Sequence, residues 1–264
     1  MKKGLGILFA LWVFWASPLQ AARVVVLYPA ASSVLYALGV SPEEVVGVTR
    51  HEKIYTRATK VGSHLRPNLE LVRALKPDLV IVGSKKAFPE EAARHLGLPV
   101  FRYDPRTVRE ILVKVLELGQ RLGREKRAQA LVQELSGKLR ALKPVSPPVR
   151  VIYEVSAEPL KVAGAKSIVN DVIRLAGGVN LIQAPRKHVL LSPEKVLALA
   201  PEVYLYQVGP MNPHPLPPEK RPYFRGLRSR LVQVEELRYA RPGLEVFSAV
   251  LELNGLFLKV RAGR

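Results

Sequence analysis

NLELVRALKPDLVIV, residues 68–82, occurs a second time in the chain as SPEKVLALAPEVYLY, residues 192–206. The two copies align without a gap at an offset of 124 residues, which is far longer than the period of a solenoid. Each copy begins with a residue that favours a helix N-cap, continues with apolar residues at helical spacing, and changes at a proline into a short apolar strand. The repeat therefore predicts two similar lobes, with one such helix and strand in each.

Strands alternate with helices on both sides of each copy, at the lengths typical of parallel βαβ units. The second half of the chain restarts with a strand at residues 149–155. The sequence thus predicts an α/β fold of two Rossmann-like lobes whose sheets are mostly parallel. The expected strands of the first lobe are 23–28, 45–49 and 100–103, and its expected helices are 31–38 and 89–96.

Residues 107–142 have a helical pattern throughout, with Gly123 as the expected interruption. A helix of about 18 residues starting at Arg124 would span roughly 27 Å, enough to cross from one lobe to the other. We therefore expect the lobes to be joined by a single long helix, with a ligand cleft between them. The expected divisions are a signal peptide at 1–21, an N-terminal lobe at 22–123, a connecting helix and linker at 124–147, and a C-terminal lobe at 148–264.

The N-terminus has the pattern of a secretory signal peptide. Lys2 and Lys3 are its basic region, residues 4–16 are an apolar core too short to span a membrane, and Ala21 or Ala22 fits the cleavage site. An uncleaved membrane anchor is the alternative. The chain has no cysteine, which excludes disulfides and a lipid-modified cysteine alike. An exported protein without an anchor stays near the cell only behind an outer membrane, so the sequence predicts the periplasm.

The chain is strongly basic, with 41 Lys and Arg against 22 Asp and Glu and a formal net charge of +19. Such a balance favours anionic partners. The basic residues are scattered, however, and no run of them is interleaved with aromatic residues as in nucleic-acid-binding motifs. We therefore expect a solvated basic surface and no nucleic-acid partner.

Two of the five histidines occupy matching positions just upstream of the two copies of the repeat. His64 lies six residues before Glu70, and His188 lies six residues before Glu194. Equivalent positions in similar lobes lie on equivalent surfaces. We therefore expect one pair to face a shared cleft while the other pair faces outward.

The doubled pattern E-x-V-x-A-L-x-P-[DE] resembles that of the helical-backbone class of periplasmic substrate-binding proteins, which serve ABC importers for cobalamin, haem and ferric siderophores. The resemblance covers essentially the whole mature chain. The other residues that match the family are Pro29 with the following helix and Gly39, Val61 with Gly62, Gly164, and DVIRLAGGVNLI at 171–182.

The resemblance implies that one acidic residue on each lobe docks onto the importer, a membrane permease dimer with a cytoplasmic ATPase. Glu70 and Glu194 stand at the matching positions, one in each copy of the repeat. The alternative is that each carboxylate only interacts with the dipole of its own helix. The two roles are compatible.

The resemblance also implies a ligand cleft, which in cobalamin-binding relatives is lined by aromatic rings from both lobes. Here His64 and His188 take two of those aromatic positions, and His51 falls at or beside a third. Imidazole stacks on macrocycles and binds transition metals, so His64 and His188 are candidate axial ligands of a chelated metal. Further candidate ligand-binding residues are Tyr28, Tyr239, Arg238, Tyr55 and Arg241, and Ser33 replaces an acidic residue found in many relatives.

These features favour the periplasmic substrate-binding component of an ABC importer, a monomer that captures an iron or cobalt chelate and delivers it to the permease. The expected ligand is a cobalamin-type corrinoid, haem or a ferric siderophore, and neither a catalytic residue nor a cofactor of the protein's own is expected. One alternative is a binder of bare zinc or manganese through His51, His64 and His188 with a carboxylate. Another is a secreted metal chelatase, although the sequence has no nucleophile elbow, phosphate-binding loop or H-E-x-x-H motif.

Overall fold

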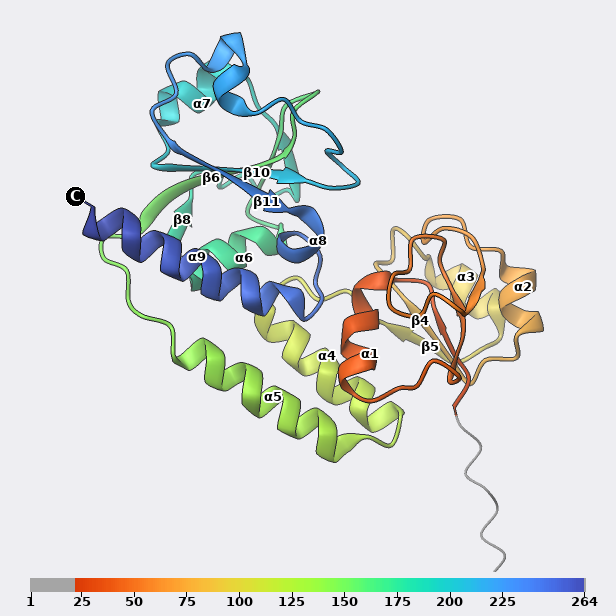
Figure 1. Cartoon of the computed structure of the whole chain (residues 1–264). Coiled ribbons are helices and arrows are strands. Elements are labelled where there is room, and N and C mark those ends of the chain that lie inside the picture. The colour runs from red at the N-terminus through yellow and green to blue at the C-terminus, as the bar shows by residue number, and fades with distance from the viewer. Residues whose placement is uncertain (1–21, 264) are drawn as a thin grey trace, which may run out of the picture.

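The computed structural model describes residues 22–263, and the predicted signal peptide at 1–21 lies outside this part of the chain. The described chain forms two lobes, one at the right and one at the upper left of Figure 1, and long helices lie below the upper-left lobe and beside the right-hand one. Each lobe has its own sheet. The expected α/β class with two lobes is therefore confirmed.

The first lobe is built on a five-stranded sheet in the order β3-β2-β1-β4-β5, with every pair parallel. Its central strand is fully buried because apolar clusters cover both faces: Val24 and Val26 face one cluster and Val25 faces another. The strands are β1 (Val24–Val26), β2 (Val45–Val48), β3 (Thr59–Lys60), β4 (Leu79–Val82) and β5 (Val100–Arg102), and the helices are α1 (Ser32–Ala37), α2 (Leu69–Ala74) and α3 (Glu90–Leu96).

The second lobe has a mixed sheet in the order β11-β10-β6-β7-β9, with β8 also paired to β6. Its pairs are parallel except β6 with β7 and β7 with β9, so the sheet is mostly parallel as expected. The strands are β6 (Val149–Ser156), β7 (Lys161–Ala163), β8 (Gly178–Asn180), β9 (His188–Leu190), β10 (Val203–Val208) and β11 (Arg230–Glu235), and the short helices are α6 (Ile168–Leu175), α7 (Pro193–Leu199) and α8 (Glu236–Tyr239).

The chain passes from the first lobe to the second through two longer helices, α4 (Val108–Arg121) and α5 (Glu125–Arg140). A third, the C-terminal α9 (Glu245–Ala262), packs against α5, α6 and α8. Helices α4 and α5 run side by side in Figure 1 and are connected by a turn at Gly123, which has a φ of +65°. Helix α5 starts against the first lobe, where Arg124 pairs with Glu44 at 2.6 Å, and it then packs on α9. The expected long connecting helix is therefore α5, while the division of the chain at residues 123 and 147 stays a prediction.

The two copies of the repeat form the same unit of structure. In the first lobe α2 leads into β4, which pairs with β1, and in the second α7 leads into β10, which pairs with β6. The side chains of Asn68 and Ser192 cap the two helices by accepting a hydrogen bond from a backbone N–H of the first turn. Val72 and Val196 are the fully buried residues at the same position of each helix.

The acidic residue after each proline also has the same role in both copies. Asp78 accepts a hydrogen bond from the backbone N–H of Arg23 at 2.8 Å, and Glu202 accepts one from the backbone N–H of Arg150 at 2.9 Å. Arg23 precedes β1 and Arg150 lies near the start of β6. The carboxylate thus ties the repeat to the first strand of its lobe, which explains why the pattern has Asp or Glu there.

The residue before each proline adopts a left-handed conformation. Within residues 22–263, Lys76 and Ala200 are the only non-glycine residues with a positive φ, and both have a φ of +44°. This conformation costs about 1–2 kcal/mol for a residue with a Cβ atom, and glycine avoids the cost. We expect Ala200→Gly to raise the free energy of unfolding by about 0.5–1 kcal/mol, because the gain exceeds the entropy that glycine adds to the unfolded chain.

Urea unfolding measures this change. The control is Ala198→Gly inside α7, where the same substitution should lower the free energy of unfolding by about 1 kcal/mol. A loss of stability in both variants would contradict the inferred strain at Ala200.

A buried ion pair holds the proline-rich segment 209–222 between β10 and β11. Arg221 is 2% exposed, and its guanidinium makes two contacts with the fully buried Glu154, at 2.5 and 2.9 Å. The Tyr204 hydroxyl also donates to Glu154 at 2.5 Å, and Arg221 Nε donates to the Leu216 carbonyl at 2.7 Å. The segment is therefore held against the core of the second lobe. It contains one short 3₁₀ helix, Pro218–Lys220, and its last residue begins another, Pro222–Phe224.

Candidate functional site

Three cavities with volumes of 680, 420 and 500 Å³ lie between the lobes; we call them the histidine, central and side cavities. Each is lined by residues of both lobes. They share walls and so form one continuous cleft. The histidine and central cavities have Tyr28, His64, Lys187, His188 and Ala240 in common, and the central and side cavities have Pro29, His51 and Arg241 in common.

The structure brings His64 and His188 to the same two cavities from opposite lobes. His64 lies in the loop between β3 and α2, where a short bridge pairs Gly62 with Pro67. His188 is the first residue of β9 and pairs with Ala163 of β7. Each histidine precedes the N-cap of its helix, α2 or α7, by the same number of residues. This equal spacing in sequence places both imidazoles at one cleft. Contact with a ligand stays a prediction.

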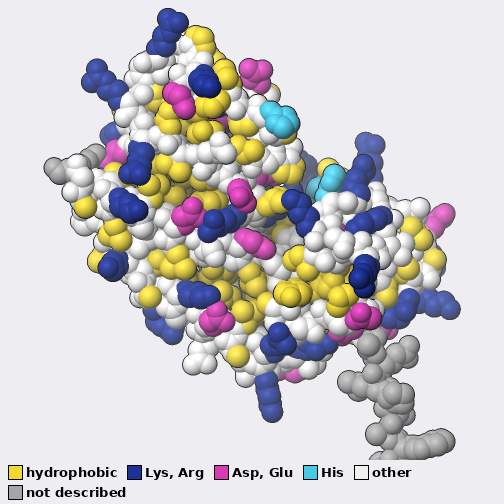
Figure 2. All heavy atoms as spheres, in the orientation of Figure 1, with side chains coloured by type: hydrophobic (Ala, Val, Ile, Leu, Met, Phe, Trp, Pro, Cys, Tyr) yellow, Lys and Arg dark blue, Asp and Glu magenta, His cyan; other side chains and the backbone are white. Residues whose placement is uncertain are grey.

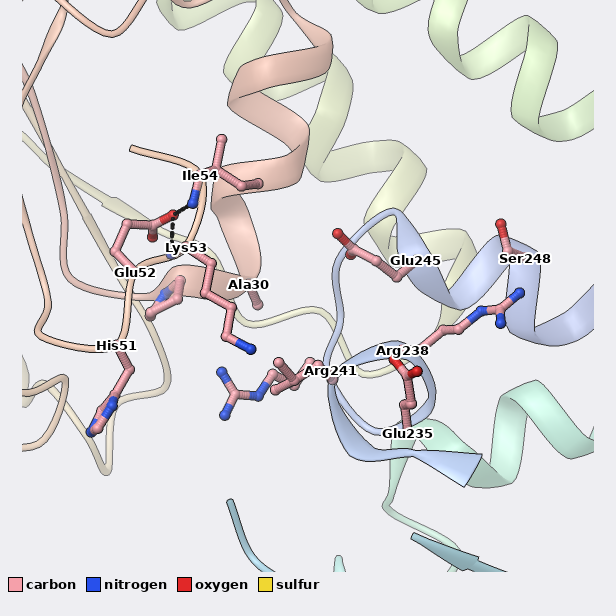
Figure 3. A pocket seen from close by; sticks show the side chains of 12 residues that line it. Ala30, His51, Glu52, Lys53, Ile54, Glu235, Arg238, Arg241, Glu245 and Ser248 are labelled. Carbon is pink, nitrogen blue, oxygen red and sulfur yellow. Dashed lines mark hydrogen bonds between the residues drawn. The ribbon is translucent and has the colours of Figure 1, made fainter. Parts of the chain in front are cut away.

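His51 lines the central and side cavities. Figure 3 shows His51 and Lys53 at the side cavity from the first lobe and Arg241 from the second, with the charged ends of Lys53 and Arg241 turned toward each other. The Glu52 carboxylate is engaged with the loop itself, since it accepts hydrogen bonds from the backbone N–H groups of Lys53 at 3.1 Å and Ile54 at 2.8 Å. The two cations therefore face the cavity without that carboxylate between them.

Tyr28, just beyond the end of β1, lines the histidine and central cavities. Its ring centre lies 6.4 Å from that of His64 and 6.3 Å from that of Tyr103. Burial, together with the nearby Asp104 carboxylate, raises the pKa of Tyr28 to about 12. The phenol is therefore protonated at neutral pH and offers a ring face and a hydrogen-bond donor beside His64.

Three other residues predicted to bind the ligand are less accessible from the cleft. Arg238 lines the side cavity, but it forms an ion pair with Glu252 at 2.9 Å. Tyr239 is only 2% exposed, belongs to the apolar core, and lines none of the three cavities. Tyr55 is equally buried, and its hydroxyl donates to the Val40 carbonyl at 3.1 Å. The structure thus gives Tyr239 and Tyr55 packing positions away from the cleft.

The histidine cavity is strongly basic. One acidic residue, Asp104, lines it, and its carboxylate already pairs with Arg106 at 2.9 Å. Elsewhere on the surface, Figure 2 shows Lys and Arg side chains spread over both lobes. A concave wall with this excess of cations attracts an anionic ligand more strongly than the convex surface does. The cations lining the cavity are Lys85, Lys86, Arg102, Arg106, Lys166 and Lys187.

Both cleft imidazoles are held in the neutral form. Burial, with Lys187 and Lys161 adding to it, lowers the pKa of His188 from 6.5 to about 4. Partial desolvation, followed by the charge of Arg241, lowers the pKa of His64. A neutral imidazole keeps a lone pair on one ring nitrogen. That lone pair can bind a metal or accept a hydrogen bond.

The depressed pKa of His188 makes stability depend on pH. As pH falls below 6.5 the unfolded chain takes up a proton that the folded protein accepts only near pH 4, so folded stability is full above 6.5 and falls toward pH 4. We expect His188→Gln to reduce the fall in melting temperature between pH 7.5 and 4.5. The control is His95→Gln on exposed α3, whose profile should stay parallel to that of the unchanged protein. Equal profiles for all three proteins would contradict this assignment.

Glu70 and Glu194 lie in the first turns of α2 and α7, and both side chains are exposed. Figure 1 shows these two helices at the ends of their lobes farthest from α4, α5 and α9. Hydrogen bonds from its own backbone N–H and from Ser192 lower the pKa of the Glu194 carboxyl, which therefore carries a charge. Their arrangement is compatible with a surface that contacts two equivalent partners, and that role stays a prediction.

Several residues of the cleft were missed by sequence reasoning. Lys187 adjoins His188, so the run RKH was an available signal for it. Thr49 lines the central cavity while being 2% exposed, and its hydroxyl has no hydrogen-bond partner within the described residues. A buried hydroxyl of this kind is available to a ligand or a water. The Ser33 hydroxyl accepts a hydrogen bond from the Leu244 N–H and donates one to Glu245, both at 3.1 Å, which ties α1 to the start of α9.

The bare-metal alternative finds no support in residues 22–263, where no group of three His, Asp or Glu side chains is placed to hold one metal ion. The described residues also contain no helix long and apolar enough to cross a membrane. The cleft therefore offers three imidazoles, those of His51, His64 and His188, and a basic wall rather than a closed set of metal ligands.

Comparison with known proteins agrees with this two-lobed architecture. The family model described as "Periplasmic binding protein" matches residues 24–209. That match covers more than half of the chain, so the chain belongs to the family of periplasmic binding proteins. The expected family is confirmed.

The similar proteins are of two kinds, vitamin B12-binding and heme-binding. The vitamin B12-binding protein of Vibrio cholerae serotype O1 (strain M66-2) is 28% identical over 199 residues, 71% of each chain. A solved structure of the periplasmic vitamin B12-binding protein BtuF of Vibrio cholerae has a TM-score of 0.75 at 21% identity, covering 91% of this chain and 98% of that one. The periplasmic heme-binding protein BhuT in complex with two hemes has a TM-score of 0.76 at 24% identity, covering 90% and 98%. Similarity alone therefore does not choose the ligand.

Proposed function

We propose that this protein is the periplasmic substrate-binding component of an ABC importer, and that it captures an iron or cobalt chelate between its lobes. One observation carries the proposal: His64 and His188, from opposite lobes, line the same cavities beside Tyr28. Two imidazoles and a phenol reaching one cleft suit the flat face and the axial positions of a metal macrocycle. The protein supplies binding and no chemistry of its own.

The charge of the histidine cavity favours haem or a ferric siderophore over cobalamin. Six cationic side chains line the cavity; Arg106 pairs with Asp104, and Lys85 and Arg102 pair with Glu90. Within the described residues, Lys86, Lys166 and Lys187 line it without an ion pair. Arg and Lys bind carboxylates and catecholate oxygens through charge-assisted hydrogen bonds, which are about twice as strong as neutral ones. The propionates of haem and the catecholates of a siderophore provide such groups, whereas a cobalamin carries neutral amides and a single phosphodiester.

Titration of the mature apoprotein with hemin, cyanocobalamin and ferric enterobactin, followed by absorption spectroscopy, tests both parts of the proposal. We expect micromolar or tighter binding of hemin or ferric enterobactin, at least tenfold tighter than cyanocobalamin, and weaker binding as salt is added. Tightest binding of cyanocobalamin would refute the preference for anionic chelates. The absence of binding to all three would refute the function.

We further propose that Glu70 and Glu194 dock onto the permease dimer, since each occupies the same position in its copy of the repeat and both side chains are exposed. The protein would reach the periplasm through residues 1–21 and act there as a monomer without a lipid anchor. Docking would then use the tips of the lobes and leave the cleft to the ligand.

Glu70→Ala combined with Glu194→Ala should leave ligand affinity unchanged and abolish uptake through the importer, because both anchoring charges are removed. Uptake of labelled ligand into spheroplasts or proteoliposomes with the cognate transporter measures this effect. The matched control is Glu91→Ala with Glu134→Ala, two other exposed acidic residues. Normal uptake by the first variant would exclude the docking role.

A further inference from the structure

A second basic cavity lies on the far side of the second lobe from the cleft. It has a volume of 550 Å³ and is lined by Arg150, Glu202 and Arg230 at the amino ends of β6, β10 and β11. These strands are parallel, and the cleft residues Val155 and Gln207 lie toward their carboxyl ends. A six-residue strand is about 20 Å long, so the two cavities are separated by the length of the sheet. We call this cavity the rear cavity.

Cations dominate the rear cavity. Arg228, Arg230 and Lys259 line it with exposed side chains, and within residues 22–263 none of them forms an ion pair. The only acidic lining residue is Glu202, whose carboxylate is engaged by the Arg261 guanidinium at 2.7 and 3.2 Å. Three cations therefore share one hollow with a carboxylate that is already paired.

The wall that carries these cations is fixed in place. The Ser229 hydroxyl, between the two arginines, donates to the Pro201 carbonyl at 2.6 Å. The backbone N–H of Arg230 donates to the Glu202 carbonyl at 2.9 Å. The segment before β11 is thus held against the turn before β10, and the arginines project from an ordered edge.

The first lobe provides an internal comparison. There β5 lies beside β4 as β11 lies beside β10, and the strand registers pair Val80 with Val100 and Tyr204 with Leu231. Because Tyr204 matches Val80 in the repeat, Arg228, Ser229 and Arg230 correspond to Gly97, Leu98 and Pro99. The duplicated framework therefore folds without cations at these three positions. Their presence in the second lobe is a property of this surface and not a requirement of the fold.

We propose that the rear cavity binds the phosphate group of an anionic molecule through Arg228, Arg230 and Lys259. Guanidinium groups match the geometry of phosphate oxygens and donate two hydrogen bonds at once, and an ammonium group adds a compact third charge. The cavity is larger than one phosphate and has room for the remainder of a phosphate ester or a lipid headgroup. This inference is independent of the proposed ligand of the cleft.

The test compares two probes at constant ionic strength. Pyrophosphate binding to the mature protein is measured by calorimetry, and co-sedimentation is measured with vesicles of phosphatidylglycerol and phosphatidylcholine against vesicles of phosphatidylcholine alone. The triple variant R228Q/R230Q/K259Q should bind at least tenfold more weakly. The control R121Q/K126Q/R140Q removes three exposed cations of α4 and α5 and should bind as the unchanged protein does. Circular dichroism and the melting temperature of both variants check that they are folded.

The outcome distinguishes the source of the phosphate. Loss of pyrophosphate binding confined to the first variant indicates a soluble phosphate ester, and loss of vesicle binding confined to it indicates a headgroup. Absence of binding to either probe by the unchanged protein would overturn the proposal. Equal loss in the control would overturn it as well, because binding would then follow net charge.

Discussion

Replacing both His64 and His188 by alanine should weaken binding of the metal chelate about 100-fold, with each single change costing about tenfold. Both imidazoles line the histidine and central cavities, so each change removes one contact from a different lobe. A factor of ten corresponds to about 1.4 kcal/mol, a modest value for a lost metal bond or a lost ring contact. Titration with hemin, followed at its Soret band, measures the change.

Two further variants sharpen this prediction. His188→Phe retains a flat ring but not the lone pair, so it should preserve affinity if the imidazole only stacks and lose it, with a changed Soret band, if the imidazole binds the metal. His95→Ala, on α3 and outside all three cavities, is the matched control and should leave affinity unchanged. Unchanged affinity in the His64 and His188 double variant would exclude both residues from the ligand site.

Arg221→Leu should lower the free energy of unfolding by about 3–5 kcal/mol. The change leaves the Glu154 carboxylate buried without its cation, and an uncompensated buried charge costs this much. The side chains are 1% and 0% exposed, so water cannot replace the lost partner. Urea unfolding followed by circular dichroism measures the loss.

The control for this prediction is Arg225→Leu, an exposed neighbour whose replacement should change stability by no more than about 0.5 kcal/mol. The double variant Glu154→Leu with Arg221→Leu should recover part of the loss, because it removes both charges together. A small effect of Arg221→Leu alone would show that the proline-rich segment is held by other contacts.

The fold was predictable because its signal is repeated. Local features can be recognised in a sequence, and three of them mark the repeat: the helix caps at Asn68 and Ser192, the apolar spacing of two helices, and a proline before each buried strand. The left-handed conformation of Lys76 and Ala200 was not predictable. Residue type does not favour it there, and it is imposed by the hydrogen bonds that bind each repeat to the first strand of its lobe.

The cleft was predictable only in part, for the same reason. His64 and His188 lie at the same spacing before the two copies of the repeat, so their common position followed from symmetry. The cations of the histidine cavity come from several unrelated loops that only tertiary folding brings together. Tyr239 was expected at the cleft because it precedes the last helix, yet it is buried, since the short α8 turns its ring into the apolar core. Which side of a one-turn helix faces inward cannot be read from four residues.

The joint between the lobes has a consequence for delivery. One apolar cluster extends from Val24 through Ile111 to Val149, and the Tyr103 hydroxyl donates across the joint to the Pro242 carbonyl at 2.7 Å. We expect so continuous a joint to keep the shape of the protein nearly the same with and without ligand, so the proposed importer, if it recognises that shape, would bind the ligand-free protein too. Under the proposed function, overproducing the protein when ligand is scarce should therefore slow uptake, because ligand-free copies compete for the same docking site.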